Sequence, residues 1–346
     1  MTAQTVLPRW RGFNLTEMIG VGSKGGFREE DFQLISELGF DFVRLPLCYR
    51  LWVRDPDDPD DLQSVNEQAL APIDQAVEWG RQYGLHVCLN FHRAPGYSVN
   101  SDWKETRSLW RSEKPLPAFK FHWTLFARRY RSVSAERLSF NLVNEPPKAR
   151  PQPPDDPVVW VMTRADHERV MRETIAAIRA EDPGRLVILD GLDYANDPCP
   201  ELADLAPLTA QSCRAYWPAG VSHWKASWFK GSDTWPVPAW PGALHEGRPW
   251  DRSDLEALFG RWIDLAAKGV GVHCGEGGAW KETPHAVVLA WLRDVFEILT
   301  PHNIGWALWN FRGGFGILDS GRADAAYEDW RGHKLDRKLL DLLREF

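Results

Sequence analysis

Cysteine is scarce in this chain of 346 residues and follows no pairing pattern. The five copies are odd in number and include no C-x-x-C pair; they are Cys48, Cys88, Cys199, Cys213 and Cys274. Disulfide frameworks and zinc ribbons both need closely spaced sets of cysteines. We therefore expect neither, and this cysteine usage is typical of a reducing compartment.

Long apolar runs and blocks of positive charge are also missing. No apolar stretch reaches the roughly 18 residues of a membrane span, so we expect no membrane partner. The opening MTAQTVLPRWRGFNL has no basic segment followed by an apolar one. We expect no secretory signal and a cytoplasmic location, with secretion left open if a leader precedes this sequence. The net charge of −7, without a lysine or arginine block, argues against nucleic acid as a partner. Nothing in the sequence indicates an oligomeric state.

What the chain does contain is a repeated succession of helix, glycine and strand. Helical patterns end at Gly39, Gly84 and Gly269, and a β-branched or aromatic run follows each at once. Glycine tolerates the left-handed conformation that ends many helices. At the other end of a helix, Ser253-x-x-Glu256 has the spacing of a capping box and predicts a helix start.

This pattern predicts a barrel. Strands are expected near residues 10–16, 40–46, 85–91, 137–144, 186–190, 210–216, 270–275 and 304–309. Alternation of strands and helices implies parallel pairing with right-handed crossovers. Eight such units fit a closed (β/α)8 TIM barrel, here a single catalytic domain over residues 1–346 with long loops at its C-terminal face.

The ends of six of these strands carry polar or aromatic side chains. These are Arg44, His92, Asn144 with Glu145, Arg214 with Tyr216, Glu276, and Trp309. Each alone has a structural explanation, such as an ion pair, a core histidine or a barrel plug. Barrel enzymes build their sites at this end of the strands, so the whole set predicts an active site.

Two carboxylates decide the chemistry that we expect there. Glu145 and Glu276 end the fourth and seventh strands, which face each other across an eight-stranded barrel. Cleavage of a glycosidic bond uses two carboxyl groups, one donating a proton to the leaving oxygen and the other attacking or activating water. Asn144 could then donate to a sugar hydroxyl, Tyr216 could hold the charge of the nucleophile, and Arg44 could orient it.

Several of these segments resemble glycoside hydrolase family 5, the cellulase and mannanase family. The segments are RLPL, FHRAPG, LVNEPP, GEGG and ALWNFRGGFGILDSGR, and the resemblance runs from Trp10 to Phe346. It implies a (β/α)8 barrel and a retaining mechanism, with Glu145 as acid/base and Glu276 as nucleophile. Separately, we expect no metal and no other cofactor. The family's sixth strand usually reads Ser-x-His-x-Tyr, whereas Arg214 stands here at the histidine position.

Tryptophan is abundant, with 19 copies, and six of them lie in one loop. The loop follows Tyr216 and contains Trp217, Trp224, Trp228, Trp235, Trp240 and Trp250. Indoles can stack on the apolar faces of sugar rings, so we expect part of this loop to bind sugar, with His223 and Trp224 nearest to the sixth strand. A loop whose indoles bury one another is the alternative. A second loop, PPKARPQPPDDP at 146–157, is expected to form a stiff wall.

The expected substrate is a β-linked glucoside or gluco-oligosaccharide, and the alternatives are a β-mannanase or β-mannosidase with the same mechanism and a sugar-binding barrel without activity. Two other enzyme classes fit less well. GVGSKG at 20–25 has the G-x-G-x-x-G pattern of dinucleotide sites, but Asp41 begins the second strand instead of ending it. A metal-dependent hydrolase would need clustered histidines, and the first strand, RGFNLTE, offers none.

Overall fold

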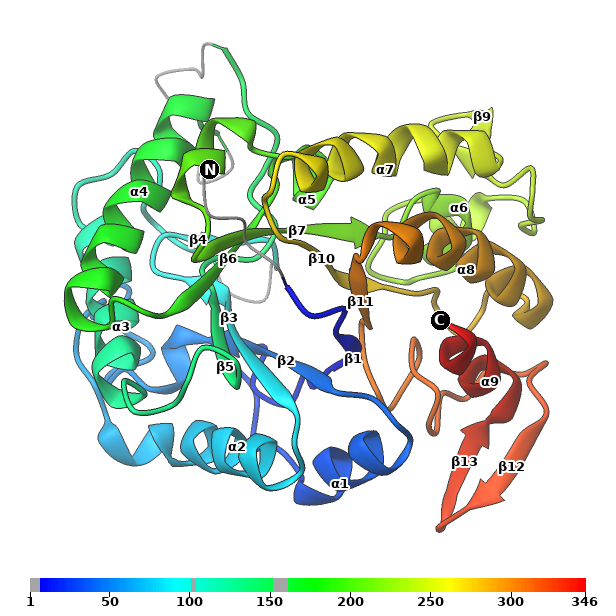
Figure 1. Ribbon diagram of the computed structural model, residues 1–346, viewed down its shortest axis with the longest axis horizontal. Coiled ribbons are helices and arrows are strands. Elements are labelled where there is room, and N and C mark those ends of the chain that lie inside the picture. Colours follow the sequence, from blue (N-terminus) through cyan, green and yellow to red (C-terminus); the bar gives the residue numbers. More distant parts are fainter. Residues whose placement is uncertain (1–6, 101–103, 152–160) are drawn as a thin grey trace. The chain divides into compact units, whose positions relative to one another are not determined.

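A computed structural model describes residues 7–100, 104–151 and 161–346 of the chain. Its main sheet contains nine strands; eight of them follow the order β2-β1-β11-β10-β7-β6-β5-β3, and a further pairing of β2 with β3 closes these eight into a barrel. These strands are β1 (Arg11–Asn14), β2 (Phe42–Cys48), β3 (His86–Ala94), β5 (Leu138–Asn141), β6 (Leu186–Asp190), β7 (Thr209–Ala215), β10 (Val272–Gly277) and β11 (Gly305–Leu308). The expected (β/α)8 barrel and its eight strands are confirmed (Figure 1).

The described chain forms two compact units, and the single domain expected over 1–346 stays a prediction. The first unit contains residues 15–212 and 269–271, and the second contains 7–14, 213–268 and 272–346. The helices of the first unit are α1 (Glu29–Glu37), α2 (Ala71–Gln82), α3 (Pro115–Arg129), α4 (Arg164–Glu181) and α5 (Leu192–Ala195). Those of the second are α6 (Ala219–Ser222), α7 (Arg252–Ala267), α8 (His285–Leu299) and α9 (Arg337–Glu345).

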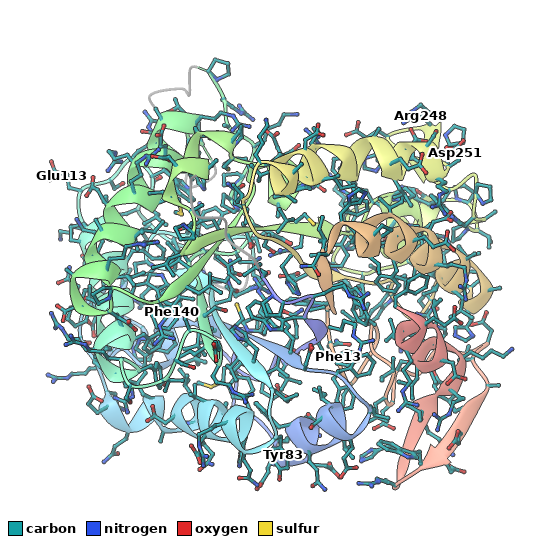
Figure 2. The ribbon with its side chains drawn as sticks, in the orientation of Figure 1. Phe13, Tyr83, Glu113, Phe140, Arg248 and Asp251 are labelled. Atoms are coloured by element: carbon teal, nitrogen blue, oxygen red, sulfur yellow. The ribbon has the colours of Figure 1, made fainter. Side chains whose placement is uncertain are left out.

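Strands β2 and β3 show why the first unit forms as it does. Every residue of both strands is buried, as expected for parallel strands covered on both faces, and Phe42 lies opposite His86 in the ladder. Outside them, α3 and α4 pack side by side (Figure 1). Phe91 of β3 stacks on Trp123 of α3 with ring centroids 4.0 Å apart, and Phe140 of β5 is fully buried (Figure 2). Aromatic packing therefore fixes α3 against the strands.

A buried histidine in the same core is held in one neutral form. His122 accepts a hydrogen bond from Trp52 at Nδ1 (3.2 Å) and donates from Nε2 to the carbonyl of Leu62 (2.8 Å). Burial lowers the pKa of His122 from 6.5 to about 4. A second proton would also remove the acceptor of the Trp52 N–H, so this side chain stays neutral in the folded protein.

In the second unit, β1 pairs in parallel with β11, and Gly12 lies opposite Ala307. Phe13 of β1 is fully buried and packs edge-on against Phe311 with centroids 5.1 Å apart (Figure 2). Helix α8 packs between α7 and α9, and the last helix buries Leu339 and Leu343. Short hairpins that the sequence analysis did not predict are β8 (Leu244–His245) with β9 (Arg248–Pro249) and β12 (Tyr327–Trp330) with β13 (His333–Asp336); β4 (Tyr97–Ser98) pairs with β3.

The start of α7 lies elsewhere than predicted. Asp251 is the N-cap; its carboxylate accepts from the N–H of Ser253, and a capping box joins it to Asp254. The expected box between Ser253 and Glu256 is therefore wrong, because aspartate two residues earlier provides the same chemistry. The glycine ends are confirmed: Gly39, Gly84 and Gly269 have φ of +87°, +73° and +88°.

No helix in the described ranges is both long enough and apolar enough to cross a bilayer.

Candidate active site

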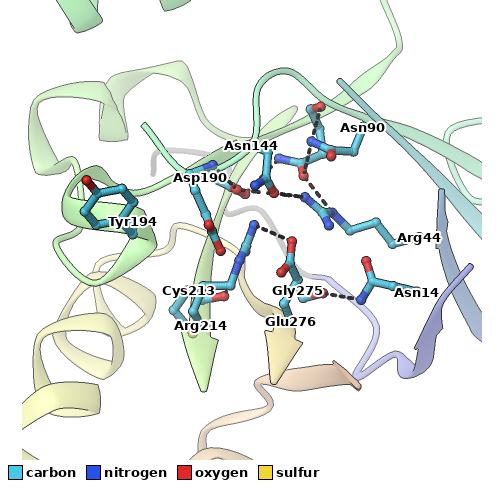
Figure 3. A network of polar contacts seen from close by, with 12 residues as sticks. Asn14, Arg44, Asn90, Asn144, Asp190, Tyr194, Cys213, Arg214, Gly275 and Glu276 are labelled. Carbon is cyan, nitrogen blue, oxygen red and sulfur yellow. Dashed lines mark hydrogen bonds and ion pairs between the residues drawn. The ribbon is translucent and has the colours of Figure 1, made fainter. Parts of the chain in front are cut away.

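The first unit contributes a network centred on Arg44, which is 1% exposed in β2. Its Nε donates to Asn141 Oδ1 at 2.9 Å and its Nη2 donates to Asn144 Oδ1 at 2.7 Å (Figure 3). Asn90 of β3 adds a further bond to Asn141 Oδ1, at 2.9 Å. The guanidinium, with donors in a rigid fork, thus fixes the orientation of both asparagines.

Asp190, the last residue of β6, supplies the opposite charge. One carboxylate oxygen accepts from Asn141 Nδ2 at 2.9 Å, and the other accepts the backbone N–H of Glu145 at 2.9 Å. The second oxygen also lies 3.9 Å from Arg44 Nη2. Both charged groups are buried, so each compensates the desolvation of the other.

Glu145 itself has an unusual backbone. Its φ of +48° lies in the left-handed region, which costs a residue with a side chain about 1–3 kcal/mol. Two contacts hold it there: Asp190 accepts its N–H, and Tyr97 Oη donates to its carbonyl at 2.6 Å. Strained residues of this kind cluster at functional sites, and this one is the expected proton donor.

A second strained segment is joined to the loop after Glu145. Asp193, Tyr194 and Ala195 of α5 have φ of +54°, +58° and +63°. The Tyr194 N–H donates to the carbonyl of Pro146 at 3.0 Å. Tyr194, which is labelled in Figure 3, is 42% exposed. Burial raises the pKa of Tyr194, and the charges of Asp193 and Glu145 raise it further. The phenol therefore remains a hydrogen-bond donor at neutral pH.

The second unit holds the other carboxylate with both of its oxygens bound. Glu276, in β10, is 2% exposed. Its Oε1 lies 3.1 Å from Arg214 Nη2 (Figure 3). Its Oε2 accepts from Tyr216 Oη at 3.0 Å. The Arg214 side chain is also buried and donates to its neighbouring carbonyl, that of Cys213, at 3.1 Å. A buried guanidinium thus neutralises the charge of Glu276.

Backbone bonds fix the strand ends around Glu276. Asn14, at the end of β1, donates from Nδ2 to the carbonyl of Gly275 at 3.0 Å (Figure 3) and to that of Leu308, also at 3.0 Å. The N–H of Trp309 donates to the carbonyl of Gly277 at 2.8 Å, and its side chain is half-buried. The ends of β1, β10 and β11 are therefore joined by side-chain and main-chain bonds.

These strand ends belong to a chain that matches known glycosidases over most of its length. The family model for cellulases, glycosyl hydrolase family 5, matches residues 2–314. The chain belongs to glycosyl hydrolase family 5. Endoglucanase C of Acetivibrio thermocellus is 27% identical over 308 residues, with 82% of this chain and 83% of that protein covered. Cellodextrinase A of Ruminococcus flavefaciens is 27% identical over 285 residues, covering 80% and 76%.

Solved structures agree with this assignment. A crystal structure of a glycoside hydrolase superposes with a TM-score of 0.89 at 38% identity, covering 97% of this chain and 99% of its own. Cel5A of Thermotoga maritima, solved with cellobiose, superposes with a TM-score of 0.73 at 20% identity and shares the fold. The protein is therefore a glycoside hydrolase of family 5, and the resemblance indicated by the sequence motifs is confirmed.

The aromatic loop of this glycoside hydrolase is partly buried and partly open. His223 follows α6, and its ring centroid lies 5.4 Å from that of Tyr216; burial lowers the pKa of His223 to about 4, so it is neutral. Trp224 is only 7% exposed and donates from Nε1 to the carbonyl of Trp235 at 3.2 Å. Trp228 is 56% exposed. It therefore has far more surface to offer to a sugar than Trp224, which the sequence analysis had favoured.

Most of the predicted site residues of the family 5 enzyme lie in these two networks. Arg44 bonds to Asn144 in the first unit, and Arg214 and Tyr216 bond to Glu276 in the second. His92 is buried in β3, 3% exposed. The roles assigned to these residues stay predictions. Residues 152–157 of the expected proline-rich wall lie outside the described residues.

Asn14, Asn141 and Asp190 were not predicted from the sequence, although the first and the last of them stand at strand ends. Asn14 and Asp190 end the two remaining strands, RGFN and LVILD, and therefore satisfy the same rule as the residues that the sequence analysis selected. Asn141 lies inside an apolar strand and was not conspicuous. In the described parts of the chain, no group of three or more His, Cys, Asp or Glu side chains could hold a metal ion.

Proposed function

We propose that this family 5 enzyme hydrolyses β-linked glucosides or gluco-oligosaccharides by double displacement. Glu276 is the nucleophile and Glu145 is the acid/base. The observation that carries the proposal is the carboxylate of Glu276, because Arg214 and Tyr216 bind one oxygen each. A nucleophile must be fixed in orientation before the substrate arrives, and the two contacts hold the carboxylate in one orientation.

The reaction has two steps. In the first, a Glu276 oxygen attacks the anomeric carbon, the bond to the leaving oxygen breaks, and Glu145 donates its proton to that oxygen. In the second, water attacks the same carbon, Glu145 takes a proton from the water, and the ester bond to Glu276 breaks. Each step inverts the anomeric carbon, so the product keeps the β configuration.

The first unit supports this scheme through the backbone of Glu145. Asp190 and Tyr97 hold Glu145 in a strained conformation, and such strain persists only where the surroundings impose it. Arg44 holds Oδ1 of Asn144, and in this proposal Nδ2 of the same amide donates to a sugar hydroxyl. Tyr194, attached to the loop directly after Glu145, offers a half-exposed ring to the leaving sugar.

The relatives support a glucose-based substrate. Their printed activities are those of an endoglucanase and a cellodextrinase, and the structural neighbour from Thermotoga maritima was solved with cellobiose. The same neighbour was also solved with mannotriose, so mannosides belong among the substrates tested.

The test is a panel of aryl β-glucosides, aryl β-mannosides and β-linked oligosaccharides, with the anomer of the first product followed by NMR. We expect a glucoside to be cut with retention. Glu276→Gln should lower kcat/KM by more than about a thousandfold. Glu113→Gln, at an exposed position, is the matched control and should keep wild-type activity (Figure 2).

Anion rescue separates the two carboxylates. In Glu276→Ala, Arg214 and Tyr216 remain, so azide should restore turnover and give the α-glycosyl azide, a single inversion. In Glu145→Ala, azide should give the β-glycosyl azide from the covalent intermediate. An α product from an unmodified enzyme would contradict the mechanism, and binding of sugars without any cleavage would favour a sugar-binding barrel.

A further inference from the structure

A row of aromatic side chains leads from the carboxylate of Glu276 to the surface of the second unit. Tyr216, which donates to Glu276, has its ring centroid 6.2 Å from that of Phe315. Phe315 lies 5.7 Å from Trp280 and 6.2 Å from Trp228. We call Tyr216, Phe315, Trp280 and Trp228 the aromatic row.

The outer end of the aromatic row is open to solvent. Trp228 is 56% exposed, whereas Phe315 is only 4% exposed. Trp228 meets Trp280 edge to face, with centroids 4.6 Å apart and planes at 84°. Phe229, the next residue, is 39% exposed, so this turn presents two neighbouring aromatic side chains to solvent, and exposed apolar patches of this kind mark ligand sites.

The turn that carries Trp228 is fixed by hydrogen bonds. The Ser232 hydroxyl donates to the carbonyl of Ala226 at 2.7 Å, and the N–H of Phe229 donates to the same carbonyl at 2.9 Å. The N–H of Lys225 donates to the carbonyl of Ser232 at 3.2 Å. Trp228 is therefore presented from an ordered turn, which lowers the entropy cost of binding a ligand on it.

Trp280 is fixed equally firmly and supports Trp228. Arg322, which is buried, donates to the carbonyls of Ala279 and Trp280 at 3.0 and 3.3 Å. A Cβ at Gly314 would lie 2.2 Å from Cζ3 of Trp280, so only glycine lets the indole lie against this backbone. The Trp280 ring therefore has no room to move away from Trp228 on that side.

We propose that Trp228, supported by Trp280, forms an accessory subsite that binds a further sugar ring of a β-linked gluco-oligosaccharide. This inference rests on the proposed function. A pyranose ring has an apolar C–H face that can cover an indole, while its hydroxyls remain in water at the rim. Lys281, whose ammonium lies 5.6 Å from the Trp280 centroid, can donate to those hydroxyls. The enzyme therefore prefers oligosaccharides to short glycosides.

The test compares cello-oligosaccharides of increasing length with four proteins: wild type, Trp228→Ala, Trp228→Phe and Val237→Ala. For wild type, kcat/KM should rise with length until the accessory subsite is filled. Trp228→Ala should lose about tenfold on the longer substrates and less than about twofold on the shortest. Trp228→Phe should recover part of the loss, and Val237→Ala, 66% exposed in the same loop, should behave as wild type.

Gly314→Ala is a second route to the same result. Its new methyl group must displace the Trp280 ring, so it should show the same length-dependent loss without removing an aromatic side chain. A loss that is equal for all lengths, or no loss in Trp228→Ala, overturns the inference.

The inference and the proposed function fail in different ways. If wild type cuts no glucoside, the proposed function is wrong. Binding of cellohexaose, followed by tryptophan fluorescence, then tests the accessory subsite alone. Binding that weakens about tenfold in Trp228→Ala supports the subsite, and unchanged binding, or none in wild type, rejects it.

Discussion

Replacement of Asp190 by asparagine tests how the acid/base residue is held. An amide of the same shape can accept at only one of its two terminal atoms, so it cannot serve both Asn141 and the N–H of Glu145. The change also leaves Arg44 buried without its opposite charge. Loss of one partner of a buried pair costs about 3–5 kcal/mol. We expect Asp190→Asn to lower the free energy of unfolding by about 3 kcal/mol.

The effect on activity follows from the strain at Glu145. The left-handed backbone of Glu145 costs about 1–3 kcal/mol. Without the bond to Asp190, the population of molecules in which Glu145 has a relaxed backbone, with negative φ, should rise by about tenfold to a hundredfold relative to the strained one. Glycosides with poor leaving groups need the acid and should lose this factor. Dinitrophenyl glycosides, whose leaving group departs without a proton, should be affected much less in the first step.

Two measurements decide the matter. Urea unfolding gives the stability change, with Asp204→Asn, an exposed partner of Arg172, as a control that should cost less than about 1 kcal/mol. Hydrolysis rates on the two leaving groups give the catalytic change. If Asp190→Asn slowed both substrates equally, the idea that Asp190 acts by holding Glu145 would be refuted.

Three further outcomes are expected. Arg214→Met leaves the buried Glu276 carboxylate without its ion-pair partner, so urea unfolding should show a loss of about 3–5 kcal/mol and activity should fall more than in Arg214→Lys. The folded-state pKa of His122 is lowered to about 4, so the stability that its neutral form contributes is present above pH 6.5 and is lost as the pH falls toward 4. The loss reaches up to about 1.4 kcal/mol per pH unit. Between pH 7 and 5, the free energy of unfolding in urea should therefore fall less steeply with pH in His122→Asn than in wild type. Asp251→Ala should cost about 1 kcal/mol in thermal unfolding and Ser253→Ala much less, and the reverse order would contradict the observed cap.

The sequence contained enough information for the barrel because its signals are local. Buried parallel strands such as β2 and β3 are short apolar runs, and glycines such as Gly84 end the preceding helices. Strand ends gave the candidate residues by the same rule. The same rule, that strand ends carry the site residues, also predicts Asp190 at the end of β6.

What could not be predicted depends on partners distant in sequence. Nothing in the sequence indicates that Asp190 accepts the N–H of Glu145, or that Arg214 lies on one oxygen of Glu276 and Tyr216 on the other. The burial of Trp224 and the exposure of Trp228 depend on how one loop folds on itself, and both residues occur in similar local sequence. Composition could identify the loop as aromatic, but only packing decides which ring is accessible.

The pairing of β1 with β11 also constrains how the molecule can form. Asn14 and Leu308, joined by a hydrogen bond, lie 294 positions apart, so the first strand has no partner in the second unit until nearly all of the chain has been synthesised. Contacts of such long range are slow to form because a large loop must close first. Residues 15–212, by contrast, form most of the first unit as one continuous segment and can associate early. We expect the edge of β1 that pairs with β11 to stay without its partner through most of synthesis, although β2, the other neighbour of β1 in the sheet, is made early. The end of β10 that carries Glu276 should then be completed last.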